Sequence, residues 1–376
     1  MKTPRPVLSS FNRPAFARPA FALAALAMAA GALPTQASTI ILGGYPDQLQ
    51  FIDDETGEVI HKITLDSGLP TNLQLSPDGK RAYVTTLTHG GIEVLDTATR
   101  KVVTSVSLND AYTKYRFSGG VPDPTGRYFY IVGEKISKEI DLYRVGQPQF
   151  MVVDLKSGEI VRAVDLPEED GGPTWRTRLA MAPDGKTLYV FQKKVLIVDT
   201  KSLEVVDRID LEKPDFPGMQ DVGFGGGLET LRTPGQYVSV FNSQDPYIRN
   251  PVFGIARFDL SSRDFTFDPI GPAPDEMAGL EVTPDGKTGY TVTVTGQLGA
   301  MRCEFWKFDL ETNAALDKAE FPCRSRFYFS MSRDGQKLYI YGAGYQIHVY
   351  DAQTLKFEQD WDLTNDITMA GLLTLP

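Results

Sequence analysis

Residues 183–211 read PDGKTLYVFQKKVLIVDTKSLEVVDRIDL. The turn motif Pro183-Asp184-Gly185 opens this stretch, and a second turn begins where Asp199 ends an apolar run. Pro suits the second position of a tight turn, and Gly supplies a positive φ. The runs Thr187–Gln192, Val195–Asp199 and Glu204–Leu211 are rich in β-branched and other apolar residues, as strands are. The stretch therefore predicts three short strands joined by two distinct turns.

The same two turns recur along the chain. An Asp ends a β-rich run and opens a polar turn at seven places, between 42 and 60 residues apart: Asp53, Asp96, Asp154, Asp199, Asp259, Asp309 and Asp351. The Pro-Asp-Gly turn or a variant of it precedes most of them, as at Pro77, Pro124, Pro183, Pro284 and Arg333, with a degenerate copy at Thr233. No amphipathic helix of ten or more residues appears after the N-terminal region. About four strands in each unit of about 48 residues predict an all-β fold, a seven-bladed β-propeller with four-stranded antiparallel blades. An open β-solenoid is the alternative, but its repeats are usually shorter and lack two distinct hairpin turns.

The two ends of the chain predict how the ring closes. The N-terminal unit has only three strands, Thr39–Leu42, Gln48–Asp53 and Val59–Leu65, and the last strand, Met369–Leu375, has no blade of its own. We expect this C-terminal strand to be the innermost strand of the first blade, because pairing the two ends removes two exposed sheet edges.

The first 37 residues predict a secretory signal peptide. Their only charges are Lys2, Arg5, Arg13 and Arg18, an apolar run extends from Ala20 to Leu33, and Thr35-Gln36-Ala37 suits a cleavage site. A membrane anchor is the alternative, but a run of this length spans only ~21 Å as a helix, short of a ~30 Å bilayer core. We therefore expect a signal peptide at 1–37, a propeller at 38–376, a periplasmic location and no membrane insertion.

Composition and charge narrow the function. The net charge is −10, it becomes −14 when the four signal-peptide cations are removed, and no basic block appears, which argues against nucleic acid or an anionic membrane as a partner. Two Cys and three widely spaced His (His61, His89 and His348) are few for a metal or haem site. No nucleophile elbow, zinc-protease, phosphate-loop, dinucleotide or haem-attachment motif occurs. We expect no catalytic residue, metal or cofactor in this chain.

Three weaker patterns have structural alternatives. Gly223–Gly227 is Gly-rich, but no strand–helix unit surrounds it, which favours a flexible loop over a phosphate site. A calcium site of the lactonase type would use Asn72, Asp221 and Glu281 facing the pore, although nothing in the sequence requires it. Cys303 and Cys323 flank a predicted hairpin centred on residue 313, which favours a disulfide in an oxidising compartment over two free thiols.

Long loops predict an interaction surface. Segments 133–149, 214–230 and 242–254 lengthen three of the blade connections. Aromatic and arginine residues gather in the loops and inter-blade links: Tyr112, Tyr115, Arg116, Tyr143, Trp175, Arg176, Arg178, Tyr247, Arg249, Arg326, Phe327 and Tyr328. Tyr, Trp and Arg are enriched in protein interfaces, although ordinary propeller loops also carry aromatics.

The blades resemble one known family. Two stretches are similar to the β subunit of quinohemoprotein amine dehydrogenase: residues 324–372, RSRFYFSMSRDGQKLYIYGAGYQIHVYDAQTLKFEQDWDLTNDITMAGL, and the opening ILGGYPDQLQFIDDETGEVIHKI. The chain resembles, more distantly, the heavy subunit of methylamine dehydrogenase and YVTN-type propellers. The likeness covers essentially all of 39–376, although the turns alone are shared with generic propellers.

The resemblance implies a periplasmic heterotrimer that oxidatively deaminates primary amines to an aldehyde and ammonia. A dihaem cytochrome c α subunit would accept electrons, and a small γ subunit would carry cysteine tryptophylquinone, so that quinone and haem c both belong to partner subunits. This chain would be the non-redox subunit on which they sit. On this interpretation Trp175, Arg178, Asn242, Phe327 and Tyr328 lie nearest the small subunit and wall an amine channel. Alternatively, Phe327–Phe329 is only an inner strand, and the whole chain is a stand-alone periplasmic propeller that binds a partner without catalysis.

Overall fold

The computed structural model describes residues 38–173, 177–192, 194–210, 220–224, 229–230, 235–244, 250–324, 326–342 and 344–375, and Ala37–Pro376 form one compact unit. The expected signal peptide, 1–37, and the expected site residue Trp175 lie outside the described residues. Apart from two short 3-10 turns, η1 (Glu168–Asp170) and η2 (Leu298–Ala300), the described regular structure is entirely β. Among these residues, no helix has the length and hydropathy needed to cross a membrane.

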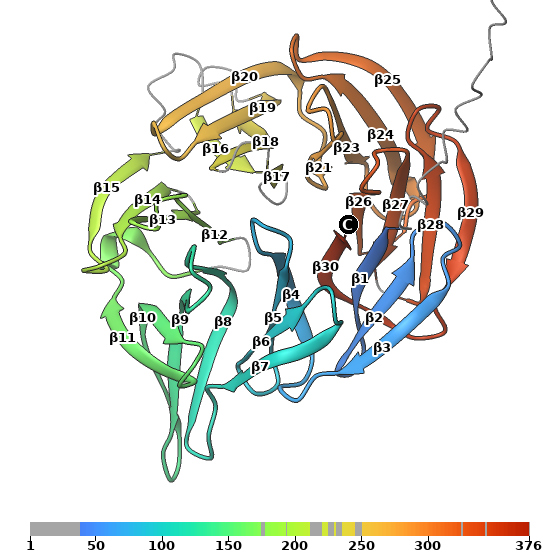
Figure 1. The fold of residues 1–376 in the computed structure, drawn as a ribbon. Helices are drawn as coiled ribbons and strands as arrows, with labels where there is room; N and C mark the ends of the chain where they lie inside the picture. The colour runs from blue at the N-terminus through green and yellow to red at the C-terminus, as the bar shows by residue number, and fades with distance from the viewer. Residues whose placement is uncertain are drawn as a thin grey trace, which may run out of the picture. The chain divides into compact units, whose positions relative to one another are not determined.

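Seven antiparallel sheets form the blades of a β-propeller, which confirms the predicted fold (Figure 1). The strands of the first three blades, from the innermost outward, are β30 (Ile367–Leu375), β1 (Thr39–Gly44), β2 (Gln48–Asp53) and β3 (Val59–Thr64); β4 (Pro70–Leu75), β5 (Arg81–Thr86), β6 (Gly91–Asp96) and β7 (Lys101–Ser107); and β8 (Thr113–Pro122), β9 (Tyr128–Lys138), β10 (Tyr143–Asp154) and β11 (Glu159–Asp165).

The remaining four blades follow in chain order around the ring. Their strands are β12 (Arg178–Met181), β13 (Thr187–Phe191), β14 (Lys194–Asp199) and β15 (Val205–Asp210); β16 (Gln220–Phe224), β17 (Glu229–Thr230), β18 (Gln236–Gln244), β19 (Pro251–Asp259) and β20 (Asp264–Pro272); β21 (Glu276–Met277), β22 (Glu281–Val282), β23 (Thr288–Thr295), β24 (Arg302–Asp309) and β25 (Ala314–Phe321); and β26 (Phe327–Met331), β27 (Lys337–Gly342), β28 (Gln346–Asp351) and β29 (Phe357–Asp362).

Two blades depart from the predicted four strands, because their innermost strand is divided into β16 and β17 or into β21 and β22. In the sixth blade the division falls at Gly279, whose φ of 99° is left-handed. The hydroxyl of Thr291 donates a hydrogen bond to the carbonyl of Gly279. The ladder is therefore interrupted by one turn residue that a neighbouring side chain holds in place.

Ring closure occurs as the sequence predicts. β30 pairs antiparallel with β1, from Thr39 opposite Leu375 to Leu42 opposite Leu372. Closure also explains why the first blade needs no Pro-Asp-Gly turn, since its innermost strand comes from the other end of the chain.

The core lies between the blades. The described buried side chains form seven apolar clusters, one at each junction between neighbouring blades. Side chains alternate across a strand, so Ile40 and Leu42 pack toward the seventh blade while Ile41 packs toward the second. The middle strands are buried on both faces, which is why they are continuous apolar runs rather than alternating ones.

The seven Asp turns share one geometry. Asp309 accepts hydrogen bonds from the amides of Glu311 and Thr312 at 3.0 and 2.8 Å, and the residue four after the Asp, Asn313, has a φ of 58°. The residue four after each of the other turn Asp residues is also left-handed: Gly57, Arg100, Gly158, Leu203, Arg263 and Leu355. Each of these turns is a four-residue hairpin connection whose last residue is left-handed, as between Asp309 and its strand partner Ala314.

Candidate functional site

A cavity of about 1010 Å³, here named the central cavity, lies where the innermost strands of five blades begin. Its polar lining includes Asn72, Arg116, Glu134, Arg178, Arg326, Tyr328 and Asp366. Its apolar lining includes Leu69, Pro70, Phe117, Val132, Ile367 and Met369. The links that enter the innermost strands supply many of these residues, so the ring brings together side chains that are far apart in the sequence. Loops held by such a rigid scaffold are common positions for binding residues.

Two of the five expected site residues line this cavity. Arg178 begins β12 and Tyr328 lies on β26, in different blades. Tyr328 is 37% exposed, and its ring centroid lies 6.1 Å from that of Tyr341. The structure therefore brings together an arginine and a tyrosine that are 150 residues apart in the sequence.

Two others lie elsewhere, and Trp175 is not described. Phe327 is half-buried and packs edge-on against Phe321, with 6.2 Å between ring centroids, in the core between the sixth and seventh blades. Asn242 is exposed on β18, where it pairs with Gly223 and Phe253, and it is not part of the central cavity lining. Phe327 thus has the packing role of an inner-strand residue.

Arg178 is held at a partly desolvated position. Its Nη1 donates a hydrogen bond to the carbonyl oxygen of Thr177 at 3.2 Å. Burial lowers the pKa of the Arg178 guanidinium below its ordinary value, while the proximity of Tyr328 acts in the opposite direction. A guanidinium stays protonated under such shifts, so the cavity wall carries a fixed positive charge.

The expected set of five omitted Arg116, Arg326 and Asn72, which also line the central cavity. Arg116 and Arg326 belong to the wider group of loop aromatics and arginines in the sequence, and Asn72 belongs to the calcium hypothesis. Of that hypothesis's three residues, Asn72 lines the cavity, Glu281 does not, and the side chain of Asp221 lies outside the described part. The described residues contain no group of three His, Cys, Asp or Glu placed to hold a metal ion.

A second feature is a three-stranded extension of the third blade, here named the arm, which consists of residues 110–117 and 133–148. From the sequence we expect a longer loop at 133–149. This prediction is wrong, because β9 and β10 pair from Lys138 opposite Tyr143 to Asp154 opposite Tyr128. Figure 1 shows this hairpin reaching away from the other blades. β8 adds the third strand, with Thr113 opposite Ser137. Bulges at Phe117/Gly120 and Val145/Pro148 separate the arm from the blade and change the direction of its strands.

The arm exposes apolar side chains at its end. Tyr112 is 72% exposed, Tyr143 62% and Val145 58%, and Ile140 and Leu142 at the hairpin turn are also exposed. Backbone hydrogen bonds fix the turn, with the amide of Glu139 donating to the carbonyl of Leu142 at 2.9 Å. The arm is therefore a candidate interaction surface.

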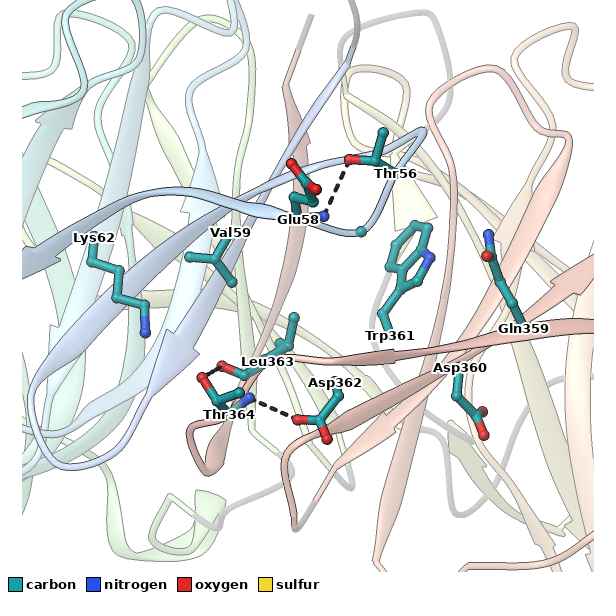
Figure 2. A pocket seen from close by; sticks show the side chains of 11 residues that line it. Thr56, Glu58, Val59, Lys62, Gln359, Asp360, Trp361, Asp362, Leu363 and Thr364 are labelled. Atoms are coloured by element: carbon teal, nitrogen blue, oxygen red, sulfur yellow. Dashed lines mark hydrogen bonds between the residues drawn. The ribbon is translucent and has the colours of Figure 1, made fainter.

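A second hollow lies at the outer edge, between the β2–β3 turn and β29 (Figure 2). This outer crevice of about 540 Å³ has Trp361 at its base, next to Gly57, where a Cβ atom would lie 2.2 Å from the indole. The threonine hydroxyls that line the crevice form hydrogen bonds within local turns. The Thr56 hydroxyl accepts a hydrogen bond from the amide of Glu58, and the Thr364 hydroxyl donates one to the carbonyl of Leu363. Blade packing therefore accounts for the outer crevice.

Cys303 and Cys323 form a disulfide with a Cα–Cα distance of 5.3 Å. It ties the start of β24 to the link after β25, beside the apolar core between the sixth and seventh blades. His348 contacts the carboxylate of Asp360 on the next strand. Neither group lines the central cavity.

These features define a seven-bladed β-propeller with a cationic central cavity and an exposed apolar arm. No protein-family model and no curated protein matches the sequence. Solved structures match it at low identity. A functionally unknown protein from Desulfotomaculum acetoxidans has 12% identity and a TM-score of 0.55, and the match covers 90% of this chain and 99% of that one.

Two further structures match comparably. The dihydro-heme d1 dehydrogenase NirN, solved in complex with DHE, has 14% identity and a TM-score of 0.52 over 89% of this chain and 74% of that one. The β-propeller domain of Cps50 (Swd1) from Myceliophthora thermophila has 14% identity and a TM-score of 0.51 over 80% of this chain and 89% of that one. Such likenesses show the fold alone, so the amine dehydrogenase resemblance stays a prediction from the sequence.

Proposed function

We propose that this chain is the non-redox propeller subunit of a periplasmic quinohemoprotein amine dehydrogenase. In the proposed heterotrimer, a small subunit with cysteine tryptophylquinone and a dihaem cytochrome c subunit supply the redox chemistry. A primary amine and water become an aldehyde and ammonia, and two electrons and two protons leave through the partners. The propeller contributes a rigid platform and no reacting group.

The arm is the observation that carries this proposal. An isolated propeller gains nothing from three paired strands that expose Tyr112, Ile140 and Tyr143 to water. Burial of exposed apolar area favours association, and aromatic residues are enriched at interfaces. The arm therefore fits the role of a subunit that is normally covered by a partner.

Capture of the exported chain from its native host tests this proposal. We expect two partners to co-purify, one with haem absorbance and one small subunit with quinone absorbance, together with amine-dependent dye reduction. A chain that purifies alone from extracts that retain amine-dehydrogenating activity would contradict the assignment and favour the stand-alone, partner-binding propeller.

Arm variants locate the interface in the same preparation. Ile140→Asp combined with Tyr143→Asp places charges on the apolar end of the arm and should release at least one partner. Val206→Asp is the matched control, because Val206 is also an exposed strand residue, 56% exposed on β15, but lies outside the arm. Retention of both partners by the arm variant would show that the subunits meet elsewhere.

A further inference from the structure

The central cavity concentrates positive charge in an acidic protein. Arg116 on β8, Arg178 on β12 and Arg326 before β26 all line it, and the carboxylates in the lining are those of Glu134 and Asp366. The whole chain has a net charge of −10. Three arginines from three blades therefore line one cavity, although the net charge of the whole chain is negative.

The backbone holds Arg326 in an unusual conformation. Seven described residues other than Gly have a positive φ, and five of them are the fourth residue after a turn Asp. Arg326, with a φ of 54°, is one of the two that no Asp turn explains. Its carbonyl lies close to Gly342, where a Cβ atom would be only 2.4 Å from that oxygen. Left-handed backbone is unfavourable at a residue other than Gly, and such residues cluster at functional sites.

Arg116 is positioned by a similar close approach. It lies directly opposite Glu134 in the β8–β9 ladder, next to Gly133, where a Cβ atom would lie 2.4 Å from the Arg116 carbonyl oxygen. Within the described residues, no ion pair within 4.0 Å joins Arg116 or Arg326 to a carboxylate. Both arginines are exposed residues that line the cavity.

The rest of the lining is suited to an apolar body. Phe117, Val132 and Ile367 contribute apolar wall, and Tyr328 contributes a half-exposed ring beside Arg178. A volume of about 1010 Å³ holds an organic molecule rather than a simple ion. Small-molecule sites are typically apolar cavities with a few placed polar groups, and arginine forks bind carboxylates bidentately.

We infer that the central cavity binds an organic carboxylate with an apolar body, whose carboxylate is held by Arg116, Arg178 and Arg326. This inference goes beyond the proposed subunit role, because it concerns a ligand of this chain alone.

Fluorescence titration of the exported chain with 1-pyrenebutyrate tests the site, and 1-pyrenebutanol is the neutral probe of matched shape. We expect the carboxylate to bind at least about tenfold more tightly than the alcohol, because charge-assisted hydrogen bonds distinguish them. Binding of the carboxylate should weaken as salt is raised. Equal binding of both probes would overturn the inference.

Variants assign the binding to the cavity. Arg116→Gln and Arg326→Gln should each weaken 1-pyrenebutyrate binding about tenfold and leave 1-pyrenebutanol binding unchanged. Arg302→Gln is the matched control, since Arg302 is an exposed arginine on β24 that pairs with Glu320 outside the cavity. Unchanged carboxylate binding in both cavity variants would overturn the inference. Circular dichroism and melting temperature establish that each variant is folded, and the titration is independent of any amine dehydrogenase partner.

Discussion

The turn aspartates are the residues that repeat most faithfully. Hydrogen bonds donated to the carboxylate lower the pKa of all seven below the ordinary value of 3.8. At Asp309 the amide of Thr312 is the largest cause, followed by the hydroxyl of Thr312. A carboxyl with a lowered folded-state pKa stabilises the fold above the unfolded-state pKa, and this stabilisation is lost as the pH falls through the folded value.

The melting temperature should therefore decline below about pH 4, where the unfolded aspartates begin to bind protons that the folded ones exclude. Thermal melts followed by circular dichroism between pH 6 and pH 2 measure the decline. Asp309→Asn keeps an acceptor oxygen but does not titrate, so its melting temperature should fall less over this range. An equal fall in the variant and the wild type would contradict the assigned role of the Asp309 carboxylate.

Buried tyrosines join neighbouring blades. Four residues after the Gly of the Pro-Asp-Gly turn, or of its variants, five blades carry a buried Tyr: Tyr83, Tyr130, Tyr189, Tyr290 and Tyr339. Tyr189 donates a hydrogen bond to the carbonyl of Leu260 in the next blade at 2.7 Å, and Tyr339 donates to the carboxylate of Asp54. Desolvation raises the pKa of Tyr290 to about 12.

Tyr189→Phe should lower the free energy of unfolding by about 1 kcal/mol, because the carbonyl of Leu260 loses a buried hydrogen bond while the ring packing remains. Urea denaturation measures the change. Tyr112→Phe serves as the control, since Tyr112 is 72% exposed on the arm. A loss no larger than that of the control would show that the blade-to-blade hydrogen bond contributes little.

Some of these residue-level features could be predicted from the sequence. The Asp and Pro-Asp-Gly turns follow from local turn chemistry, so they could be read directly. The tyrosine repeat was visible at a fixed offset from the turn Gly, but its partner lies in the next blade, which local reasoning does not supply. Arg178 and Tyr328 were predicted from their links, whereas Arg116 and Arg326 needed the ring geometry to be placed beside them.

Among the elements, the β24–β25 hairpin shows how a bulge changes register. A symmetric turn at residue 313 would place Cys303 opposite Cys323. In the structure Cys303 lies opposite Phe321, because Asp309 pairs with Ala314 and so centres the turn before residue 313. The bulge between Lys307 and Phe308 moves the register by only one residue toward Cys323. The cysteines are therefore diagonal neighbours, and Cys323 lies two residues beyond the end of β25.

Thiol titration of the denatured, non-reduced protein should find no free Cys. Paired Cys303→Ser and Cys323→Ser substitutions should destabilise the fold by about 3 kcal/mol, since the bond closes a loop with a sequence separation of 20. Two titratable thiols in the exported protein would contradict the bonded state.

The arm shows why long connections are hard to interpret from sequence alone. Apolar and polar residues alternate in KISKEIDLYRV as they do in a strand, but the charged residues of the segment favour a loop. Pairing partners on β8 and β10 turn it into sheet, and its apolar side chains stay exposed because no blade packs against them. The fold of this element was therefore missed, and its role as an interaction surface stays a prediction.

In the molecule as a whole, ring closure couples the two ends of the chain. β30 supplies buried Ile367, Ala370 and Leu375 to the junctions of the first blade and pairs along β1. Deleting residues 369–376 exposes the edge of β1 and opens the ring. The expected loss in the free energy of unfolding is comparable with the whole stability of a typical domain, about 5–15 kcal/mol.

The truncated chain should therefore be unfolded or melt far below the wild type in a calorimetric scan. The Ile140→Asp variant is the control, because it changes an exposed arm residue and should melt normally. A truncated chain with the wild-type melting temperature would contradict closure by β30.

The central claim is that this propeller acts as a silent subunit of an amine-oxidising complex. Size-exclusion chromatography of the native host's periplasm tests it most directly, with the chain followed by antibody, haem by absorbance and activity by amine-dependent dye reduction. We expect all three signals to elute together, at a mass above that of the mature chain, and the isolated chain to reduce no dye. Activity that elutes away from the chain, or that the isolated chain carries by itself, would contradict the account.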